Sequence, residues 1–350
     1  MCIRDREYLV RIDEQWGKNE AWLDDMSRAA EETLPLAREE LVRLSGRVAA
    51  ARGENAPRNA EEASRLFLAL WGKAPESLDA AVKLYSGAME RARGLCREQR
   101  IFREPSGYDL SFRVLPSGFL PGTPATNLPA PLLAPHKSGH VLVADDAKAH
   151  SVSGAANLGV HEGFPGHYLQ SLAWQRAFAA HPAPVRFFHV SDDVAMAHSY
   201  FGTMLGVEGF AAYAEEVMLS AGLYTDEEAL LAVVSKAIRA ARVLVDVRLH
   251  ASNDSFEAIA SFYSSATGMP VGWTRNQVLR SMRMPLQVVS YFAGKVEIER
   301  LRQNSVSALG EAFDSEAFHE ELFRLGPIPP QLGNERFPTK GVPRVPLTMA

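Results

Sequence analysis

Two histidines and two glutamates near the middle of the chain have the residue types of a metal-dependent hydrolase. His161 is followed at once by Glu162, His167 comes six residues after the first histidine, and Glu208 follows about forty residues later. A catalytic zinc ion typically takes three protein ligands from His and Glu and keeps one position open for water. A carboxylate beside the first ligand would accept the proton of that water, while the metal polarises the substrate carbonyl.

The spacing of the two histidines requires an irregular backbone. Residues six apart on a straight helix are separated by about 120° around its axis, which is too far for both rings to reach one ion. Pro165 and Gly166 lie between His161 and His167. Such a pair can kink, bulge or interrupt a helix. We therefore expect a local break that swings His167 back towards His161.

The segment from Glu208 to Glu215 is the second informative stretch. Its two glutamates are seven residues apart and would project from nearly the same face of a helix. Two carboxylates among Gly, Ala, Phe and Tyr would be costly to bury without a cation or hydrogen-bond donors. A metal with His ligands would satisfy Glu208, and Glu215 could hold the ring N–H of a ligand or a neighbouring Arg. An ordinary polar helix face is the alternative for each residue taken singly.

A polar stripe follows on a later apolar helix, where Arg239, Arg242, Asp246 and His250 recur at spacings of three, four and four. His250 could donate a hydrogen bond to a developing oxyanion, and Arg242 could bind a substrate carboxylate. Asp246 would support these groups from the same stripe. The alternative is an internal Arg242–Asp246 pair at i,i+4 that only stabilises the helix.

Tyr291 is a further candidate for the stabilisation of a transition state. The small residues after it, Ala293 and Gly294, would let another backbone or a substrate approach closely. A phenol at this place could be the second oxyanion donor. A core tyrosine with a hydrogen-bonded hydroxyl is the alternative.

The composition is that of an ordinary globular protein. Of 350 residues, 47% are hydrophobic and 23% are charged, and the formal net charge is -5. This balance and the absence of a basic stripe argue against a nucleic-acid partner. No apolar run reaches the length of a membrane span, so we expect a soluble chain without a transmembrane segment. The two cysteines cannot form a disulfide framework.

The pattern of elements predicts a mainly α fold (α+β) of many helices with a small antiparallel β-sheet. We expect an N-terminal helical lobe over 1–103, with one helix beginning at an Asn59 cap. A metallohydrolase core over 104–326 would hold a small antiparallel sheet and then successive helices. These helices are expected at 154–180, 187–221, 226–251, 254–266, 274–303 and 315–324. The Pro-rich segment 327–350 should form an extended or disordered arm.

The first residues, Met1 to Arg6, run into helix-like sequence without a cap or a signal peptide. This beginning suggests an N-terminally truncated chain whose first residues are not native. Cytoplasmic localisation is then only a default, because a missing leader could have directed export.

Several motifs resemble those of the DUF885 family. His161 to Gln170, HEGFPGHYLQ, is similar to the family's His-Glu, Pro-Gly-His and Leu-Gln signature. The Glu208 segment is similar to its Glu-Gly-Trp-Ala-x-Tyr-x-Glu, with Phe210 in place of Trp. Further similarities cover about residues 100 to 335 and include 239–250, 291–295, 318–319 and 326–329.

The resemblance implies a gluzincin-type zinc metallopeptidase of zincin-like, multi-helix architecture, in which His161, His167 and Glu208 bind one zinc ion per chain. Glu162 would be the general base that activates a zinc-bound water for attack on a peptide bond. The partner would be a peptide or a small amide substrate. Two alternatives stay open: a metal-dependent amidase or esterase on non-peptide substrates, and a non-catalytic binding or structural module. The sequence does not indicate an oligomeric state.

Overall fold

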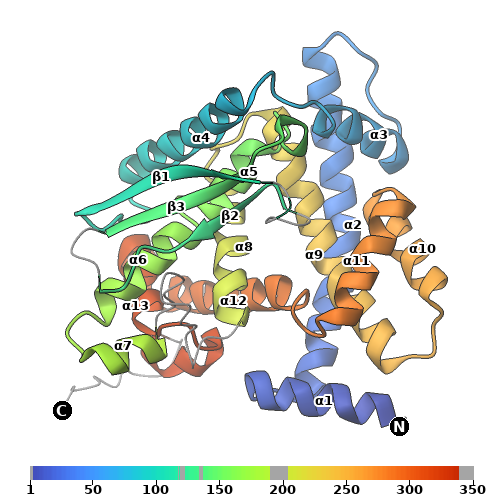
Figure 1. Ribbon diagram of the computed structural model, residues 1–350. Helices are drawn as coiled ribbons and strands as arrows, with labels where there is room; N and C mark the ends of the chain where they lie inside the picture. The colour runs from blue at the N-terminus through green and yellow to red at the C-terminus, as the bar shows by residue number, and fades with distance from the viewer. Residues whose placement is uncertain (1–2, 117, 119–122, 134–136, 190–203, 339–350) are drawn as a thin grey trace. The chain divides into compact units, whose positions relative to one another are not determined.

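The computed structural model is mainly helical, with one small sheet (Figure 1). It describes residues 3–116, 118, 123–133, 137–189 and 204–338. These residues form 13 α-helices and a three-stranded sheet, which confirms the predicted mainly α class. None of the described helices has both the length and the apolar run needed to cross a bilayer.

The chain divides into two compact units that are each discontinuous in sequence. The first unit combines residues 1–75, 151–157 and 224–293, and the second combines 76–150, 158–223 and 294–350. These packing units have other boundaries than the division at residues 103 and 326 expected from the sequence. That division into domains stays a prediction.

The first unit consists of helices joined by short connections. They are α1 (Ile3–Trp16), α2 (Glu20–Ala51), α3 (Ala60–Trp71), α9 (Asp226–Ala251), α10 (Phe256–Thr267) and α11 (Val271–Arg283). The long helices α2 and α9 pack along each other (Figure 1). The Asn59 side chain accepts a hydrogen bond from the Glu62 backbone, which confirms the predicted cap of α3. A capping box of Thr225 and Glu228 begins α9.

The second unit contains the sheet and most of the remaining helices. Its helices are α4 (Leu78–Gln99), α6 (His167–Ala177), α7 (Ala183–His189), α8 (Met204–Ser220) and α13 (Ser315–Arg324), with short 3₁₀ segments η2 (Ala147–Ala149), η3 (Gly310–Ala312) and η4 (Pro330–Arg336). Helices α5 (Ala155–Glu162) and α12 (Ser290–Leu309) begin in the first unit and continue into the second.

Several of the predicted elements differ from the structure. The helix expected over 154–180 is divided into α5 and α6, and the one over 274–303 into α11 and α12. The second break lies at Pro285, because a residue before proline, here Met284, avoids the helical conformation. The prediction of an extended or disordered C-terminal arm is wrong for η4, a 3₁₀ helix in which Pro330 takes the first helical position and is buried. Residues 339–350 of that arm, and 190–203 of the helix expected over 187–221, lie outside the described residues.

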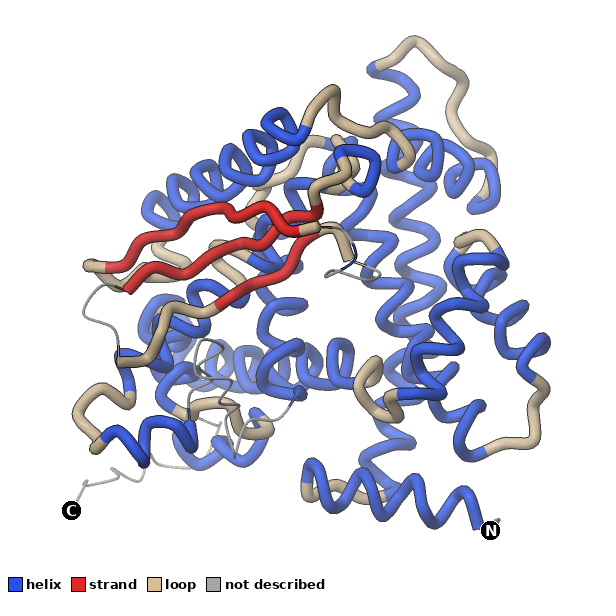
Figure 2. The backbone as a smooth tube through the Cα atoms, in the orientation of Figure 1, coloured by secondary structure: helices blue, strands red, loops and turns tan. Residues whose placement is uncertain are grey.

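The sheet is mixed, not antiparallel as expected. Its strands β1 (Tyr108–Leu115), β2 (Ala125–Leu128) and β3 (Lys137–Ala144) lie in the order β1-β3-β2 (Figure 2). Strands β2 and β3 pair antiparallel, whereas β1 and β3 pair parallel. The chain reverses twice between β1 and β3, so the two run in the same direction, and β3 lies between its predecessors. The antiparallel pairing expected from the sequence is thus correct for β2 and β3, which are neighbours in sequence, and wrong for β1 and β3, which are not.

One face of the sheet is covered by helices of the second unit. Tyr85 of α4 packs on Phe112 of β1 with ring centroids 6.5 Å apart, and Gly139 of β3 faces the Tyr168 ring of α6. Ser111, which neighbours Phe112 and so points to the other face, is exposed and bonds Nδ1 of His140 at 2.7 Å. The covered face therefore holds the core of the sheet, with β2 at its edge next to α6.

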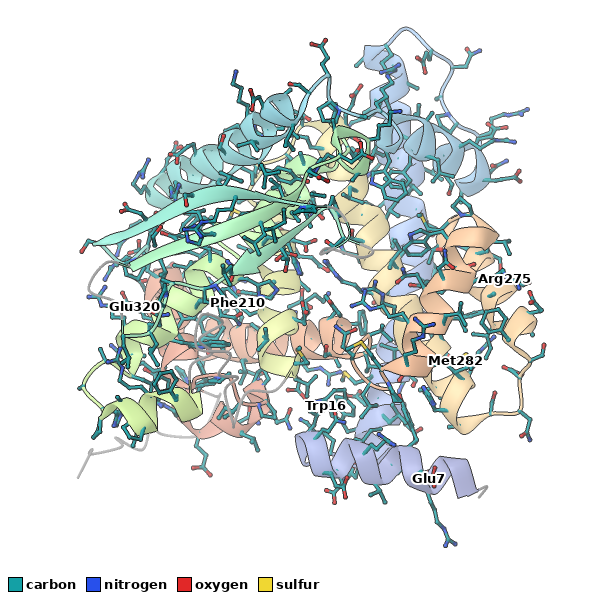
Figure 3. All side chains as sticks on the ribbon, in the orientation of Figure 1. Glu7, Trp16, Phe210, Arg275, Met282 and Glu320 are labelled. Carbon is teal, nitrogen blue, oxygen red and sulfur yellow. The ribbon has the colours of Figure 1, made fainter. Side chains whose placement is uncertain are left out.

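Helix α8 is anchored in the second unit by aromatic packing and by a close crossing with α12. Phe210, labelled in Figure 3, packs edge-on against Phe102 and Phe323, at centroid distances of 6.0 and 5.0 Å. A Cβ atom on Gly209 would lie 2.9 Å from the Lys295 backbone nitrogen and closer still to Gly294. Only glycines permit this approach of two backbones.

Candidate metal centre

The segment from Glu162 to His167 joins two helices by a compact turn. Helix α5 ends at Glu162 and α6 begins at His167, and the Phe164–Pro165 peptide bond is cis. The Gly166 N–H donates to the Val160 carbonyl at 2.9 Å, and a Cβ atom on Gly166 would collide with the Val160 and His161 carbonyls. The turn thus separates the two helices at a glycine that no other residue can replace without movement.

The turn brings the two imidazoles together with Glu208 of α8. The Nε2 atoms of His161 and His167 lie 3.4 and 3.3 Å from the Oε2 atom of Glu208, and the three donors are within 4.8 Å of one another. Zinc binds His and carboxylate at about 2.0–2.1 Å, so the edges of its tetrahedron measure about 3.3 Å. The two separations to Glu208 therefore match the edges of a tetrahedral zinc site.

Both candidate ligand rings are held from behind by polar side chains. His161 donates from Nδ1 to Oε1 of Glu215 at 2.6 Å, and His167 donates from Nδ1 to Oε1 of Gln170 at 3.3 Å. The Gln170 amide is oriented in turn, because its nitrogen donates to the Gly206 carbonyl at 2.8 Å. With Nδ1 protonated, each histidine presents the lone pair of Nε2 to the shared space, as ligands of a metal do.

Glu162 lies beside the donor set without belonging to it. Its Oε2 atom accepts a hydrogen bond from the Asn127 backbone N–H of β2 at 2.9 Å. The side-chain nitrogen of Asn127 is buried and has no hydrogen-bond partner among the described residues. A buried donor of this kind is usually satisfied by a ligand or water.

Sequence reasoning assigned no role to Asn127 or Gln170. Gln170 could have been found from its position, because it follows His167 by three residues on one helix and so lies over the same face. Nothing in the local sequence distinguishes Asn127, since only the sheet brings it to Glu162.

The charges of the site are strongly coupled. Burial alone would lower the pKa of His161, but the carboxylates of Glu208 and Glu215 outweigh it and raise this pKa to about 10. Burial alone would raise the pKa of Glu208, but its electrostatic interactions with His161 and His167 hold this pKa well below its ordinary value. Burial raises the pKa of Glu162. Carboxylates in so buried a place need a positive charge nearby.

Glu215→Gln is expected to weaken zinc binding by a factor of about 10 to 100, because the amide is a poorer acceptor for the His161 ring. Competition with a chromogenic chelator measures the affinity. Glu216→Gln is the matched control, since the neighbouring carboxylate pairs with Lys295 at 2.9 Å instead. Equal zinc affinity in the two variants would show that Glu215 does not support the ligand.

The structure places the remaining sequence candidates in the first unit. Asp246 of α9 is fully buried, and its Oδ2 atom accepts hydrogen bonds from the Tyr8 hydroxyl at 2.8 Å and the Leu286 N–H at 3.0 Å. His250 stacks on Tyr8 with centroids 5.4 Å apart and bonds the Ser281 carbonyl through Nε2 at 3.2 Å. These contacts tie α9 to α1 and α11. The catalytic role of His250 and the supporting role of Asp246 stay predictions.

Arg242 and Tyr291 also meet in the first unit. The Arg242 guanidinium lies 5.1 Å from the centre of the Tyr291 ring and donates to the Gln277 amide oxygen at 3.1 Å. The Tyr291 hydroxyl accepts hydrogen bonds from Arg280 at 3.3 Å and Gln287 at 3.2 Å. The Arg242–Asp246 ion pair considered as an alternative is not formed among the described residues. Substrate binding by Arg242 and oxyanion stabilisation by Tyr291 stay predictions.

Asp246→Asn is expected to remove a pH dependence of stability from the first unit. Burial raises the pKa of Asp246 to about 7, above its unfolded value of about 3.9. The protonated form thus favours folding, and this contribution is complete below the unfolded pKa and is lost as the pH rises through 7. Urea unfolding at pH 5 to 8 should show the wild type losing stability relative to the variant.

The control for this prediction is Asp254→Asn, at an exposed aspartate of the same unit. It should follow the wild type at every pH. Parallel curves for wild type and Asp246→Asn would show that Asp246 does not titrate in this range.

His319, which is also buried, has a structural role. The Nε2 atom of His319 bonds the Tyr213 hydroxyl at 2.9 Å, and its Nδ1 donates to the Ile101 carbonyl at 2.8 Å. Burial lowers the pKa of His319 to about 3, so the ring is neutral. This pair joins α8 to α13 and thereby holds the helix that carries Glu208.

Comparison with known proteins gives one family match. A family described as "Bacterial protein of unknown function (DUF885)" matches residues 21–335. No curated protein matches the chain.

Two solved structures have a similar fold. A "putative lipoprotein" from Colwellia psychrerythraea superposes with a TM-score of 0.75 at 21% identity, covering 94% of this chain and 54% of the other. A "putative lipoprotein of unknown function" from Shewanella oneidensis superposes with the same TM-score of 0.75 at 18% identity, covering 94% and 59%. This chain thus spans between half and two thirds of the length of those proteins, and the likeness shows the fold alone.

Proposed function

We propose that this chain, which belongs to the DUF885 family of bacterial proteins of unknown function, is a zinc-dependent hydrolase and more specifically a metallopeptidase. The observation that carries the proposal is the convergence of His161 Nε2, His167 Nε2 and Glu208 Oε2, with separations of 3.3 and 3.4 Å to the carboxylate oxygen. Zinc would be held by these three atoms, and when bound it would supply a Lewis acid that polarises a carbonyl and acidifies water.

The residues around the donor set support catalysis as well as metal binding. Glu162 is not one of the three donors that converge. Its carboxylate lies beside these donors and accepts a hydrogen bond from the Asn127 N–H at 2.9 Å. A positioned carboxylate of this kind can take a proton from an attacking water and pass it to the leaving amine. Glu215 and Gln170 would keep both imidazoles oriented during turnover.

The edge of the sheet supports a peptide as substrate. Strand β2 is an outer strand, and the Asn127 N–H points away from β3 towards Glu162. An extended peptide could pair with such an edge, because free backbone groups of an outer strand bind other strands. The unpartnered Asn127 amide nitrogen would then donate to a substrate carbonyl close to Glu162.

The experiment that tests the proposal is elemental analysis of protein purified without chelator. We expect about one zinc ion per chain in the wild type and none in His161→Ala, because removal of one of three ligands abolishes tight binding. His140→Ala is the matched control, since this histidine of the same unit bonds Ser111 and should not affect zinc content.

The outcomes separate the proposed function from its alternatives. Zinc retained by His161→Ala, or absent from the wild type after reconstitution, would contradict the site and favour a non-catalytic binding module. Bound zinc without cleavage of a broad peptide library would favour an amidase or esterase on other substrates.

A further inference from the structure

A small pocket in the first unit combines aromatic walls with two arginines. Its volume is about 190 Å³, and it lies among α3, α9, the segment after α10 and the start of α11. Its lining includes three aromatic side chains and two arginines: Phe67, Trp71, Trp273, Arg239 and Arg242. Phe67 and Trp71 stack with centroids 5.8 Å apart and an interplanar angle of 12°, and this offset stacked pair forms one wall of the pocket. None of the lining residues carries a carboxylate.

Arg242 supplies a polar group to this pocket, and its hydrogen bonds are incomplete. Its Nη2 atom donates to the neutral Gln277 amide at 3.1 Å, and its guanidinium lies over the Tyr291 ring at 5.1 Å. The Nε atom is buried and makes no hydrogen bond in the part of the chain that the structure describes, although the guanidinium also interacts with the buried Tyr263 hydroxyl. A buried guanidinium N–H without an acceptor is costly, and a ligand anion would satisfy it.

Two further arginines lie close to Arg242. Arg239 lies 5.9 Å from the same Tyr291 ring, and Arg280 bonds the Tyr291 hydroxyl at 3.3 Å. Within the described residues, no carboxylate lies within ion-pair distance of Arg242 or Arg280. Arginine forks bind carboxylates well, and they do so more strongly where water is partly excluded.

We propose that this pocket binds a small organic carboxylate with an aromatic body. The carboxylate would accept from Arg242, and the ring would lie against the Phe67–Trp71 wall and Trp273. The volume suits such a ligand, since a cavity of about 150 Å³ already accepts benzene. This site is independent of the proposed zinc chemistry, because all of its residues differ from the donor set and none is needed to bind a metal.

The test uses the five tryptophans of the chain as reporters. Protein labelled with ¹⁵N in the indole rings, in the His161→Ala background, is titrated with 3-phenylpropanoate and with its neutral analogue 3-phenylpropanamide. The loss of the proposed zinc ligand in this background excludes binding of the carboxylate to a metal there. We expect saturable shifts of the Trp71 and Trp273 signals, assigned from Trp→Phe variants, with Trp16, Trp22 and Trp174 unaffected. The amide should bind at least about tenfold more weakly, because it lacks the charge.

Arg242→Met should weaken binding of 3-phenylpropanoate by at least about tenfold, since the charged hydrogen bond is lost. Arg248→Met is the matched control: it lies on the same helix and over the Phe262 ring at 3.7 Å, but outside the pocket. If Arg242→Met does not fold, Arg242→Lys replaces it and should weaken binding several-fold through loss of the planar fork.

Three results would overturn the proposal. They are equal affinity for the carboxylate and its amide, unchanged affinity in the Arg242 variant, and acetate or inorganic phosphate binding as tightly as 3-phenylpropanoate. Failure of zinc binding in the wild type would leave this test unaffected, because the titration is made in a variant that lacks the proposed metal ligand.

Discussion

Glu162→Gln is expected to retain about one zinc ion per chain and to lower kcat/KM for peptide hydrolysis by a factor of about 10² to 10⁴. The glutamine side chain has the same shape and can still accept the Asn127 N–H, which lies 2.9 Å from Oε2 in the wild type. It cannot take a proton from water. The metal content should survive because Glu162 is not one of the three donors that converge.

The measurement pairs elemental analysis with single-turnover assays on a fluorogenic peptide library. Glu162→Asp is the control that keeps the charge but withdraws the carboxylate by one methylene, and it should retain part of the activity. Wild-type turnover in Glu162→Gln would remove Glu162 from the role of general base. Loss of zinc in this variant would instead indicate that Glu162 contributes to the metal site.

Gly294→Ala is expected to destabilise the second unit by about 3 kcal/mol, at the upper end of the usual cost of overpacking. A Cβ atom at this position would collide with the Leu205 carbonyl and lie 2.9 Å from the Gly209 Cα atom. Both partners are backbone of α8, which cannot rotate away as a side chain could. Helix α8 would have to shift, and Glu208 with it, so zinc affinity should fall together with stability.

Urea unfolding and chelator competition measure the two effects. Gly87→Ala is the matched control, because this glycine also lies within a helix but has open space where a Cβ would be. It should gain about 0.5–1 kcal/mol from the higher helix propensity of alanine. An unchanged midpoint in Gly294→Ala would show that the α8–α12 crossing tolerates a wider separation.

The metal centre shows how far local rules reach. His161, Glu162 and His167 lie within seven residues of sequence, so their proximity and the break at Pro165–Gly166 were predictable from spacing and backbone chemistry. The geometry of the break was not predictable, because a turn of this composition could also have bulged and continued the helix. The hydrogen bond from Gly166 to the Val160 carbonyl and the close packing at Gly166 accompany the end of α5 at Glu162 and the start of a separate helix, α6, at His167.

Other parts of the site depend on residues that are distant in sequence. Glu208 meets the histidines because α8 is held by its crossing with α12 and by the Tyr213–His319 bond. Asn127 reaches Glu162 because β2 is an outer strand of the sheet. Hydrophobic periodicity in the sequence cannot predict such contacts, because it shows which face of an element is apolar and not which element covers that face.

The same division applies to the fold. Helix caps such as Asn59 and the mainly α class follow from local propensity and pattern, which act within a few residues and were predictable. Whether β1 runs parallel or antiparallel to β3 depends on which strand lies between which, and whether Arg242 pairs with Asp246 or with Gln277 depends on what packs against α9. Tertiary structure alone decides these points, because strand order and side-chain partners are set by competition among groups that the chain brings together only when it folds.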